Sequence, residues 1–340
     1  MTVHPAGGPG GASADLVPGI DPALNARLAN GMAAVQDRLS QVLDYDDPFL
    51  AEAGGHLAQA GGKRFRPLLT LLCAQVGDGI DERVVDAAVG VELTHLASLY
   101  HDDVMDEAAL RRGVASANVR YGNSTAILVG DMLFGTASSV VAGLGPAAVR
   151  IQAETFVRLC AGQIRDDRAP APGADPVDYH LQVLADKTGA LIATAARYGA
   201  MFGGCEPETV RTLTAYGEQI GVVFQLADDL LDIASEVEDS GKTPGTDLRE
   251  GKVTLPMLYA RGSTDPGDLR LQHLLAQPIT GQVELDEALR LLRVHPAMGT
   301  AREQTLALAD RARDLLDPLG DAAAVQALRA LVDGVALRST

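Results

Sequence analysis

The sequence predicts an all-α protein, and three observations support this prediction. Aromatic residues make up only 4% of the 340 residues, and tryptophan is absent. Alanine and leucine are abundant, whereas the alternating runs of β-branched residues that favour strands are scarce. Amphipathic or apolar segments with helical spacing follow one another from residue 23 to residue 336, separated only by short breaks that contain glycine or proline.

Short breaks mark the boundaries between the helical segments. The clearest lie at residues 61–62, 77–79, 203–204 and 262–263. A chain of this length can form two domains or one large one. Because no long linker divides it, we expect one helical domain over residues 21–340. The first twenty residues contain five glycines and three prolines, and we expect them to form an unstructured tail.

Three other segments are informative. Residues 166–176 contain three prolines and predict a surface loop, whereas residues 238–252, charged and glycine-rich, predict a lid. Residues 124–149 are the most apolar stretch, but Asp131 and four glycines interrupt it. They predict a buried core helix, so we expect no transmembrane segment.

Charge and cysteine content exclude two classes of function. The chain has 28 basic and 45 acidic residues, a net charge of −17, which would repel a nucleic acid backbone. The three cysteines, Cys73, Cys160 and Cys205, are widely spaced and form no Cys-x-x-Cys pair. This arrangement is typical of a reducing cytoplasm and of neither a disulfide framework nor a zinc site.

Two of the four Asp-Asp pairs are predicted to carry chemistry. The pair at residues 46–47 precedes a proline and the pair at residues 166–167 leads into the proline-rich loop, so both are interpreted as solvated turns. The other two pairs each begin an Asp-x-x-Asp repeat within an apolar helical segment. Their carboxylates belong to Asp102, Asp103, Asp106, Asp228, Asp229 and Asp232.

Helical spacing predicts that each aspartate triplet gathers charge on one face. Two carboxylates about 4 Å apart repel by roughly 4 kcal/mol where the effective dielectric constant is about 20. No basic residue within either triplet offsets this repulsion. Oxygen ligands of this kind select Mg²⁺, or Mn²⁺, over zinc, and Mg²⁺ usually combines few carboxylates with phosphate oxygens. The triplets therefore predict metal-mediated binding of a diphosphate.

Basic residues that could complete a diphosphate site occur in compact clusters. Residues 61–67, Gly-Gly-Lys-Arg-Phe-Arg-Pro, form a glycine turn that opens into a helix and suits an anion. Further basic positions are Arg111, Arg112, Lys187, Lys242 and Lys252. A nucleotide P-loop has the pattern Gly-x-x-x-x-Gly-Lys-Ser/Thr. It is excluded at Lys242, because Glu236 stands where the first glycine is required, and at Lys252, because Val253 stands where serine or threonine is required.

Taken together, these motifs resemble the trans-isoprenyl diphosphate synthases, the polyprenyl synthetase family, over nearly the whole chain after the tail. The matching segments are residues 61–67, 92–95, 101–106, 111–113, 224–232, 241–252 and 255–256. The resemblance implies an isoprenoid synthase fold: one all-α bundle around a deep central cavity, usually as a homodimer. It also implies a Mg²⁺-dependent prenyltransferase that ionises an allylic diphosphate and condenses it with isopentenyl diphosphate.

The resemblance further assigns roles to individual positions. The metal and the reaction are assigned to the six aspartates, with Lys187 as a further catalytic residue. Isopentenyl diphosphate is assigned to Lys63, Arg66, His95 and Arg112. The allylic diphosphate is assigned to Arg111, Lys187, Thr188, Gln225, Lys242 and Lys252.

Product length is predicted from the helix that precedes the first aspartate motif. Ala97 and Ser98, five and four positions before Asp102, are small, where short-chain members of the family place aromatic residues. An open tunnel and a product of about seven to ten isoprene units are therefore expected, with peripheral membrane contact at product release. Met132 and Phe134 are candidates for the tunnel floor, or for ordinary core positions. We expect Ala97→Phe or Ser98→Tyr to shorten the product.

Three alternatives stay open at this point. A geranylgeranyl or farnesyl diphosphate synthase would share all the motifs and differ only in product length. A terpene cyclase shares one aspartate motif but has a mixed second metal site and lacks the segment at residues 61–67. A noncatalytic partner subunit of a two-component synthase would have lost its aspartates.

Overall fold

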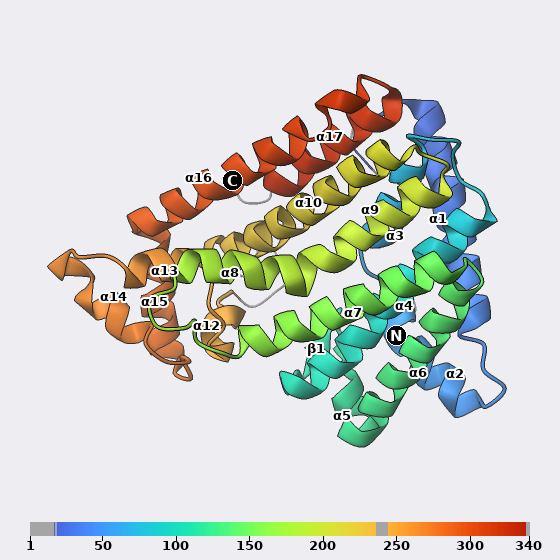
Figure 1. The fold of residues 1–340 in the computed structure, drawn as a ribbon. Coiled ribbons are helices and arrows are strands. Elements are labelled where there is room, and N and C mark those ends of the chain that lie inside the picture. The colour runs from blue at the N-terminus through green and yellow to red at the C-terminus, as the bar shows by residue number, and fades with distance from the viewer. Residues whose placement is uncertain (1–16, 18, 236–243, 338–340) are drawn as a thin grey trace, which may run out of the picture.

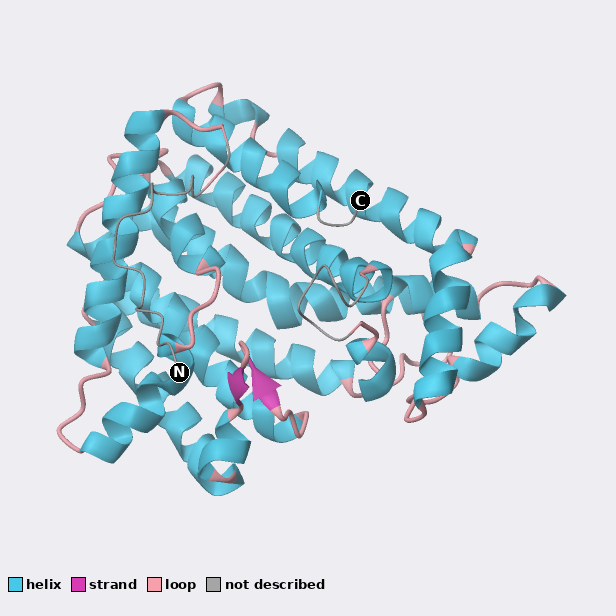
Figure 2. Ribbon diagram, turned by 180° about the vertical axis from the view of Figure 1, so that it is seen from behind, coloured by secondary structure: helices cyan, strands magenta, loops and turns pink. Residues whose placement is uncertain are grey.

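The computed structural model describes residue 17, residues 19–235 and residues 244–337, and these are helical almost throughout. The predicted all-α class is confirmed. Within the described residues the only strands are β1 (Leu110–Arg111) and β2 (Val114–Ala115), which pair antiparallel in a small hairpin (Figure 2). Most of the predicted tail, residues 1–20, lies outside the described residues.

The helices pack side by side into an elongated bundle, with α14 and α15 at one end and α1 at the other (Figure 1). Those of the first half are α1 (Pro22–Val42), α2 (Pro48–Gln59), α3 (Phe65–Ala74), α4 (Glu82–Met105), α5 (Ala117–Tyr121), α6 (Asn123–Ala142) and α7 (Pro146–Asp166). Those of the second half are α8 (Pro176–Leu184), the π-helical turn η1 (Ala185–Gly189), α9 (Ala190–Phe202), α10 (Pro207–Ala234), α12 (Thr246–Glu250), α13 (Leu255–Arg261), η2 (Pro266–Asp268), α14 (Leu269–Leu274), α15 (Gln282–Val294), α16 (Pro296–Asp314), η3 (Asp317–Leu319) and α17 (Ala323–Ala336).

Local sequence signals explain where many of these helices begin. Proline occupies the first turn of α1, α2, α7, α8, α10 and α16, where its missing N–H is not needed and its fixed φ suits a helix. Asp47 lies in an exposed bend, as expected, and also caps α2. Its Oδ1 accepts a hydrogen bond from the Phe49 N–H at 2.8 Å.

The buried apolar side chains form two cores that share helices. The larger core joins α1, α3, α4, α6, α9 and α17, and the smaller joins α8 and α12 to α15. Helix α10 contributes Tyr216 and Ile220 to the larger core, and Leu226 and Leu230 to the smaller one. Helix α16 also belongs to both. Helices α10 and α16 therefore connect the two cores.

Helix α6 covers residues 124–142 of the apolar stretch for which one core helix was expected, and the rest of that stretch forms a turn and the start of α7. The length and composition of α6 match those of a membrane span, and 39% of its most apolar window is buried inside the molecule. It packs along α4, the helix that carries the first aspartate motif. One face of α6 is thus core, as predicted, while the other leaves Leu128 66% exposed.

Candidate active site

The two aspartate motifs border one cavity. The first motif ends α4, where Asp106 is the C-cap, and the second lies near the C-terminal end of α10. Side chains from α3, α4, α6, α7, η1 and α10 enclose a volume of about 870 Å³. Of the residues predicted from the sequence, its walls contain Lys63, Arg66, His95, Ser98, Asp102, Arg111, Arg112, Phe134, Lys187, Thr188, Gln225 and Asp228.

Asp102 is the carboxylate of the first motif that lines this cavity. Burial raises its pKa, and the neighbouring charge of Asp106 raises it further, whereas Lys187, Arg111 and Lys252 oppose the shift. A desolvated carboxylate beside a second one is stabilised by any cation that reaches both. The site therefore attracts positive charge at this point.

Asp103 faces away from the cavity and is fully buried. Its Oδ1 accepts a hydrogen bond from Arg111 Nε at 2.7 Å, and its Oδ2 accepts one from the Ala117 N–H at 3.1 Å. Adjacent helical residues point about 100° apart, so Asp102 and Asp103 cannot share one face. The expectation that all three carboxylates project into one volume is corrected: Asp103 fastens the β1–β2 hairpin and α5 to α4.

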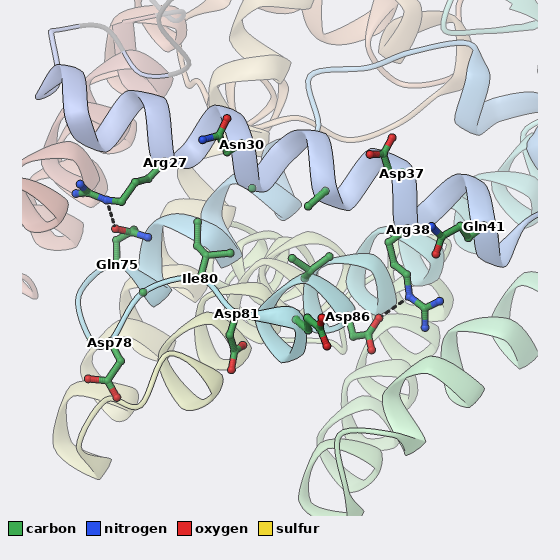
Figure 3. A pocket seen from close by; sticks show the side chains of 16 residues that line it. Arg27, Asn30, Asp37, Arg38, Gln41, Gln75, Asp78, Ile80, Asp81 and Asp86 are labelled. Atoms are coloured by element: carbon green, nitrogen blue, oxygen red, sulfur yellow. Dashed lines mark hydrogen bonds and ion pairs between the residues drawn. The ribbon is translucent and has the colours of Figure 1, made fainter.

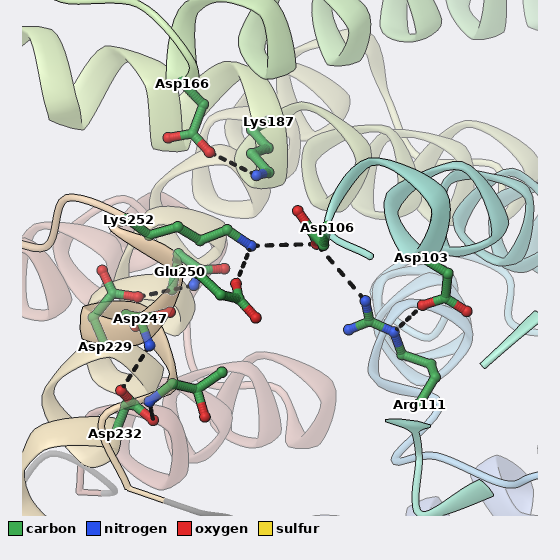
Figure 4. A network of polar contacts seen from close by, with 12 residues as sticks. Asp103, Asp106, Arg111, Asp166, Lys187, Asp229, Asp232, Asp247, Glu250 and Lys252 are labelled. Carbon is green, nitrogen blue, oxygen red and sulfur yellow. Dashed lines mark hydrogen bonds and ion pairs between the residues drawn. The ribbon is translucent and has the colours of Figure 1, made fainter. Parts of the chain in front are cut away.

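Asp106 links the first motif to the segment that follows the second (Figure 4). Its Oδ2 lies 3.3 Å from Lys252 Nζ and 3.9 Å from Arg111 Nη2. Lys252 also contacts Glu250 at 2.7 Å. Burial opposes the charge on Lys252, but Glu250 and Asp106 outweigh it and raise its pKa. Lys252 therefore stays cationic at the mouth of the site.

The second motif divides its carboxylates in the same way. Asp228 lines the cavity, whereas Asp229 is 5% exposed and accepts a hydrogen bond from Gln225 Nε2 at 2.9 Å. Burial, together with Asp247 and the other two aspartates, raises the pKa of Asp229 well above its usual range. Asp232 accepts hydrogen bonds from the N–H groups of Thr246 and Asp247, both at 3.2 Å, and so holds the start of α12.

A group of basic side chains, among them Lys63, Arg66 and Arg112, also lines the cavity. Burial and the adjacent Arg112 lower the pKa of Arg66 to about 10, although Glu92 acts in the other direction. Nε of Arg66 is buried without a hydrogen-bond partner in the described residues. Burial and the surrounding arginines lower the pKa of His95 well below its usual value, so its imidazole is neutral. This positive, partly desolvated wall is suited to an anion.

Backbone geometry fixes the arginines of this wall. Arg64 and Arg112 both have left-handed backbone, with φ of 46° and 54°. The Arg64 guanidinium donates to Glu92, and that of Arg112 donates to the carbonyl of Leu57 at 2.8 Å. Gly62 has a φ of 124°, which favours glycine, and a Cβ there would lie 3.0 Å from Arg112 Cζ, so the guanidinium would have to shift.

Lys187 and Thr188 lie in the π-helical turn η1, a form often found at functional sites. The turn is possible because Gly162 of α7 packs directly against it: a Cβ there would come 2.6 Å from Lys187 N. Thr188 Oγ1 donates to Gln225 Oε1 at 3.3 Å. Gln225 thus connects this turn to the second aspartate motif.

Asp166 corrects an interpretation of the sequence. It was expected in a solvated turn, but it is the last residue of α7 and is only partly exposed. Its Oδ2 lies 2.7 Å from Lys187 Nζ (Figure 4). Lys187 is thus held by a carboxylate from another helix. The residues that follow, 167–175, form the expected loop.

The residues predicted to set product length divide into two pairs. Ser98 and Phe134 line the cavity. Ala97 and Met132 do not: Ala97 is fully buried in the larger core, and Met132 packs against that core beside α2. The prediction for Ala97 and Met132 is corrected, because their positions on α4 and α6 direct them away from the cavity. Phe156 of α7, which was not predicted, packs against Phe134 with ring centroids 4.1 Å apart and the rings tilted by 53°.

The arrangement of donors fits a hard divalent cation that is bound together with its substrate. Among the described residues, no three His, Cys, Asp or Glu side chains form a ready-made metal cage. Mg²⁺ commonly retains waters and uses only one or two carboxylates, completed by phosphate oxygens. Asp102, Asp106 and Asp228 could hold such ions. Lys242, predicted as a further diphosphate contact, lies outside the described residues, as do residues 238–243 of the predicted lid. The rest of that segment, residues 244–252, contains α12.

A second hollow of about 1080 Å³ lies between α1 and the start of α4 (Figure 3). Its walls contain five carboxylates and only two basic side chains. One of these, Arg38, is paired with Asp86 at 2.8 Å. This acidic groove would repel a diphosphate, which leaves the cavity between the motifs as the candidate active site.

Comparison with known proteins identifies the family of this chain. The polyprenyl synthetase family model matches residues 47–292. The nonaprenyl diphosphate synthase of Mycobacterium tuberculosis is 47% identical over 314 residues, which are 92% of this chain and 94% of that protein. A geranylgeranyl pyrophosphate synthase structure from Corynebacterium glutamicum, complexed with calcium and isoprenyl diphosphate, is 41% identical with a TM-score of 0.84, covering 94% of this chain and 98% of that one.

A third similar protein is the decaprenyl diphosphate synthase of Rhodobacter capsulatus. Its structure is 32% identical, has a TM-score of 0.85 and covers 94% of this chain and 99% of that chain. The sequence motifs, the helical fold and the shared coverage lead to one conclusion: the chain belongs to the polyprenyl synthetase family and is a prenyltransferase.

Proposed function

We propose that this prenyltransferase elongates an allylic diphosphate with isopentenyl diphosphate, in a Mg²⁺-dependent reaction, to an all-trans product of heptaprenyl to decaprenyl length. One observation carries the proposal: Asp102 and Asp228 border the same cavity, in which Lys187 and Arg111 supply cations and aromatic side chains form part of the wall. Mn²⁺ is expected to replace Mg²⁺, because both take oxygen ligands.

Different residues of the chain would bind the two substrates. Lys187, Arg111 and Lys252 would bind the diphosphate that departs from the allylic substrate, since each is cationic and lies beside an aspartate motif. Bound Mg²⁺ would neutralise the charge that develops on this diphosphate. Isopentenyl diphosphate would be held by Arg66, Arg112 and the neutral His95, which line the same cavity.

The apolar part of the cavity would protect an allylic cation from water. Leu99, Phe134, Phe156 and Leu159 line it together with Phe224. None of these five side chains carries a nucleophile, so this part of the wall would not trap the cation before the double bond of isopentenyl diphosphate attacks it. Condensation releases a proton, and the departing diphosphate is an acceptor for it.

The small side chain of Ser98 and the 47% identity to a nonaprenyl diphosphate synthase support a long product. A geranylgeranyl or farnesyl diphosphate synthase is the alternative. It is favoured by the Phe134–Phe156 pair, which narrows the cavity, and by the 41% identity to a geranylgeranyl pyrophosphate synthase. Terpene cyclisation is disfavoured by the second Asp-Asp-x-x-Asp motif, and a noncatalytic subunit by the presence of all six aspartates.

One assay separates these functions. The purified chain alone is incubated with radiolabelled isopentenyl diphosphate, Mg²⁺ and either geranyl, farnesyl or geranylgeranyl diphosphate, and the dephosphorylated products are sized by chromatography. We expect chains of heptaprenyl to decaprenyl length. Products that stop at geranylgeranyl would establish the short-chain alternative, and a cyclic hydrocarbon would establish a cyclase. No product with any primer would favour the noncatalytic subunit.

We also propose that the protein is a cytoplasmic homodimer. Its cysteines are free thiols, which is typical of a reducing compartment. The neighbouring helices α6 and α7 leave Leu128, Val157 and Ile164 exposed at 66, 68 and 58%, an apolar surface that supports a contact between copies. Light scattering should give twice the chain mass, and Leu128→Asp with Val157→Asp should halve it. Peripheral membrane contact at product release is tested by sedimentation with lipid vesicles.

A further inference from the structure

His180 of α8 places an unpartnered imidazole nitrogen beside the second aspartate motif. Its side chain is 6% exposed, and its Nε2 lies 3.9 Å from Oδ2 of Asp229. This nitrogen is buried and has no hydrogen-bond partner in the described residues. Buried polar atoms in folded proteins are nearly always hydrogen-bonded, so an exception at the edge of a reactive site requires an explanation.

The two side chains are suited to a hydrogen bond with each other. A neutral imidazole carries one N–H, which is either on Nδ1 or on Nε2. With the hydrogen on Nε2, that N–H has Asp229 as its nearest acidic neighbour. A hydrogen bond of this type has a length of about 2.9 Å, so the observed distance needs to shorten by about 1 Å.

The first aspartate motif shows what the completed arrangement looks like. In Asp103, the middle aspartate, each carboxylate oxygen accepts one hydrogen bond, from Arg111 Nε at 2.7 Å and from the Ala117 N–H at 3.1 Å. Asp229 has the same position in the second motif. Its Oδ1 accepts from Gln225 Nε2 at 2.9 Å, while the side chain near its Oδ2 is His180.

We propose that His180 is a positioning residue of the second aspartate motif. Its Nε2–H is the second donor to Asp229 and, together with Gln225, fixes the orientation of this carboxylate when a divalent cation is bound at the motif. The inference rests on the proposed function, because it assigns a supporting side chain to the same metal site. Asp229 is the direct neighbour of Asp228, the carboxylate of this motif that lines the cavity. Loss of an outer hydrogen-bond donor at a metal site typically changes metal affinity by about 10- to 100-fold.

The test compares four forms of the full-length protein: wild type, His180→Leu, His180→Gln and the control Tyr179→Phe. Leucine removes the donor, whereas the glutamine amide reaches the position of Nε2. Tyr179 is the neighbour of His180 on α8, and its hydroxyl donates a hydrogen bond to the Arg165 carbonyl of α7 at 2.9 Å. Tyr179→Phe removes this bond, which does not involve the aspartate motif. The probe is Mn²⁺ with inorganic pyrophosphate, and free Mn²⁺ is measured by electron paramagnetic resonance.

We expect His180→Leu to raise the Kd for Mn²⁺ about tenfold, and His180→Gln to restore it to within about threefold of the wild-type value. Tyr179→Phe should leave it unchanged. Thermal unfolding in EDTA reports any separate loss of stability. If His180→Leu does not fold, His180→Asn replaces it, because the shorter amide ends before the Nε2 position and should weaken Mn²⁺ binding to a similar extent.

The outcomes separate the inference from the proposed function. A His180→Leu variant that loses thermal stability but binds Mn²⁺ like the wild type would show that His180 only packs, and a glutamine variant as weak as the leucine variant would overturn the inference as well. Wild-type protein that binds no Mn²⁺ in the presence of pyrophosphate would overturn both the inference and the proposed metal site.

Discussion

Nζ of Lys252 lies 3.3 Å from Oδ2 of Asp106, so the segment that follows the second aspartate motif touches the first motif across the mouth of the cavity. The contact joins the C-cap residue of α4 to a residue of the loop after α12, which are far apart in the chain (Figure 4). A cation held at this point faces any diphosphate that is bound between the two motifs.

Replacement of Lys252 should therefore impair the reaction more than the fold. We expect Lys252→Gln to lower kcat about a hundredfold, as does the loss of one preorganised donor to developing negative charge. The free energy of unfolding should change by less than about 1 kcal/mol, because the ion pair is partly exposed. Initial rates and urea unfolding measure the two effects. Glu250→Gln, which removes only the outer partner of Lys252, is the matched control, and an equal loss of kcat in both variants would contradict the prediction.

Asp103 and Asp106 should separate stability from activity. Asp103→Asn leaves a buried N–H of Ala117 facing an amide group and weakens the bond to Arg111, so we expect the free energy of unfolding to fall by about 2 kcal/mol. Asp106 lies at a partly exposed helix end, so we expect Asp106→Asn to change the free energy of unfolding by no more than about 0.5 kcal/mol. Its activity should nevertheless fall strongly. Equal destabilisation of both variants in urea would refute the different roles assigned to them.

Product length should respond to the side chains that line the cavity. Ser98→Tyr is expected to shorten the product, and Phe156→Ala to lengthen it, because Phe156 and Phe134 together narrow the apolar wall. The structure changes the expectation for Ala97→Phe: an aromatic ring at this fully buried position should destabilise the protein by roughly 1–3 kcal/mol. Chromatography of the dephosphorylated products checks the first two variants. An unchanged chain length in both would show that another part of the wall sets it.

The raised pKa of Asp102 predicts how stability depends on pH in the absence of metal. Below about pH 4 this carboxyl is protonated in both the folded and the unfolded chain. As pH rises, the unfolded chain releases the proton first, so the free energy of unfolding falls until the pH passes the raised pKa of the folded state. Asp102→Asn removes this effect. In EDTA, its stability relative to the wild type should therefore increase with pH over that window.

Urea unfolding at a series of pH values measures this difference. Mg²⁺ with pyrophosphate should reduce it, because the cation favours the ionised carboxylate. A difference that stays constant with pH in EDTA would mean that the folded protein does not perturb Asp102.

Much of the fold and of the site could be predicted from the sequence, because the relevant signals are local. Helical spacing and glycine breaks predict the all-α class, and the two aspartate motifs differ from the other Asp-Asp pairs by their apolar surroundings. The position of Asp103 shows the limit of this reasoning. Spacing of three or four residues places side chains on one face, but the direction of an adjacent residue depends on the partners available around the helix, here Arg111 and Ala117.

The remaining features depend on contacts between distant segments, which carry no signal within one sequence. Asp166 has proline-rich neighbours in the chain, yet in space its neighbour is Lys187. Phe156 belongs to an ordinary amphipathic helix until Phe134 is placed against it. The position of Glu92 could have been predicted in part, since it lies three residues before His95 and therefore on the same helical face.

The two cores described above have a consequence for the cooperativity of unfolding. Helix α10 packs in both cores and carries Asp228 near its C-terminal end. The helices at the far end of the bundle cannot separate from the rest without loosening the helix that holds this carboxylate. Loss of the smaller core is therefore also loss of the reaction centre, and heat inactivation should follow the same curve as the loss of helical circular dichroism.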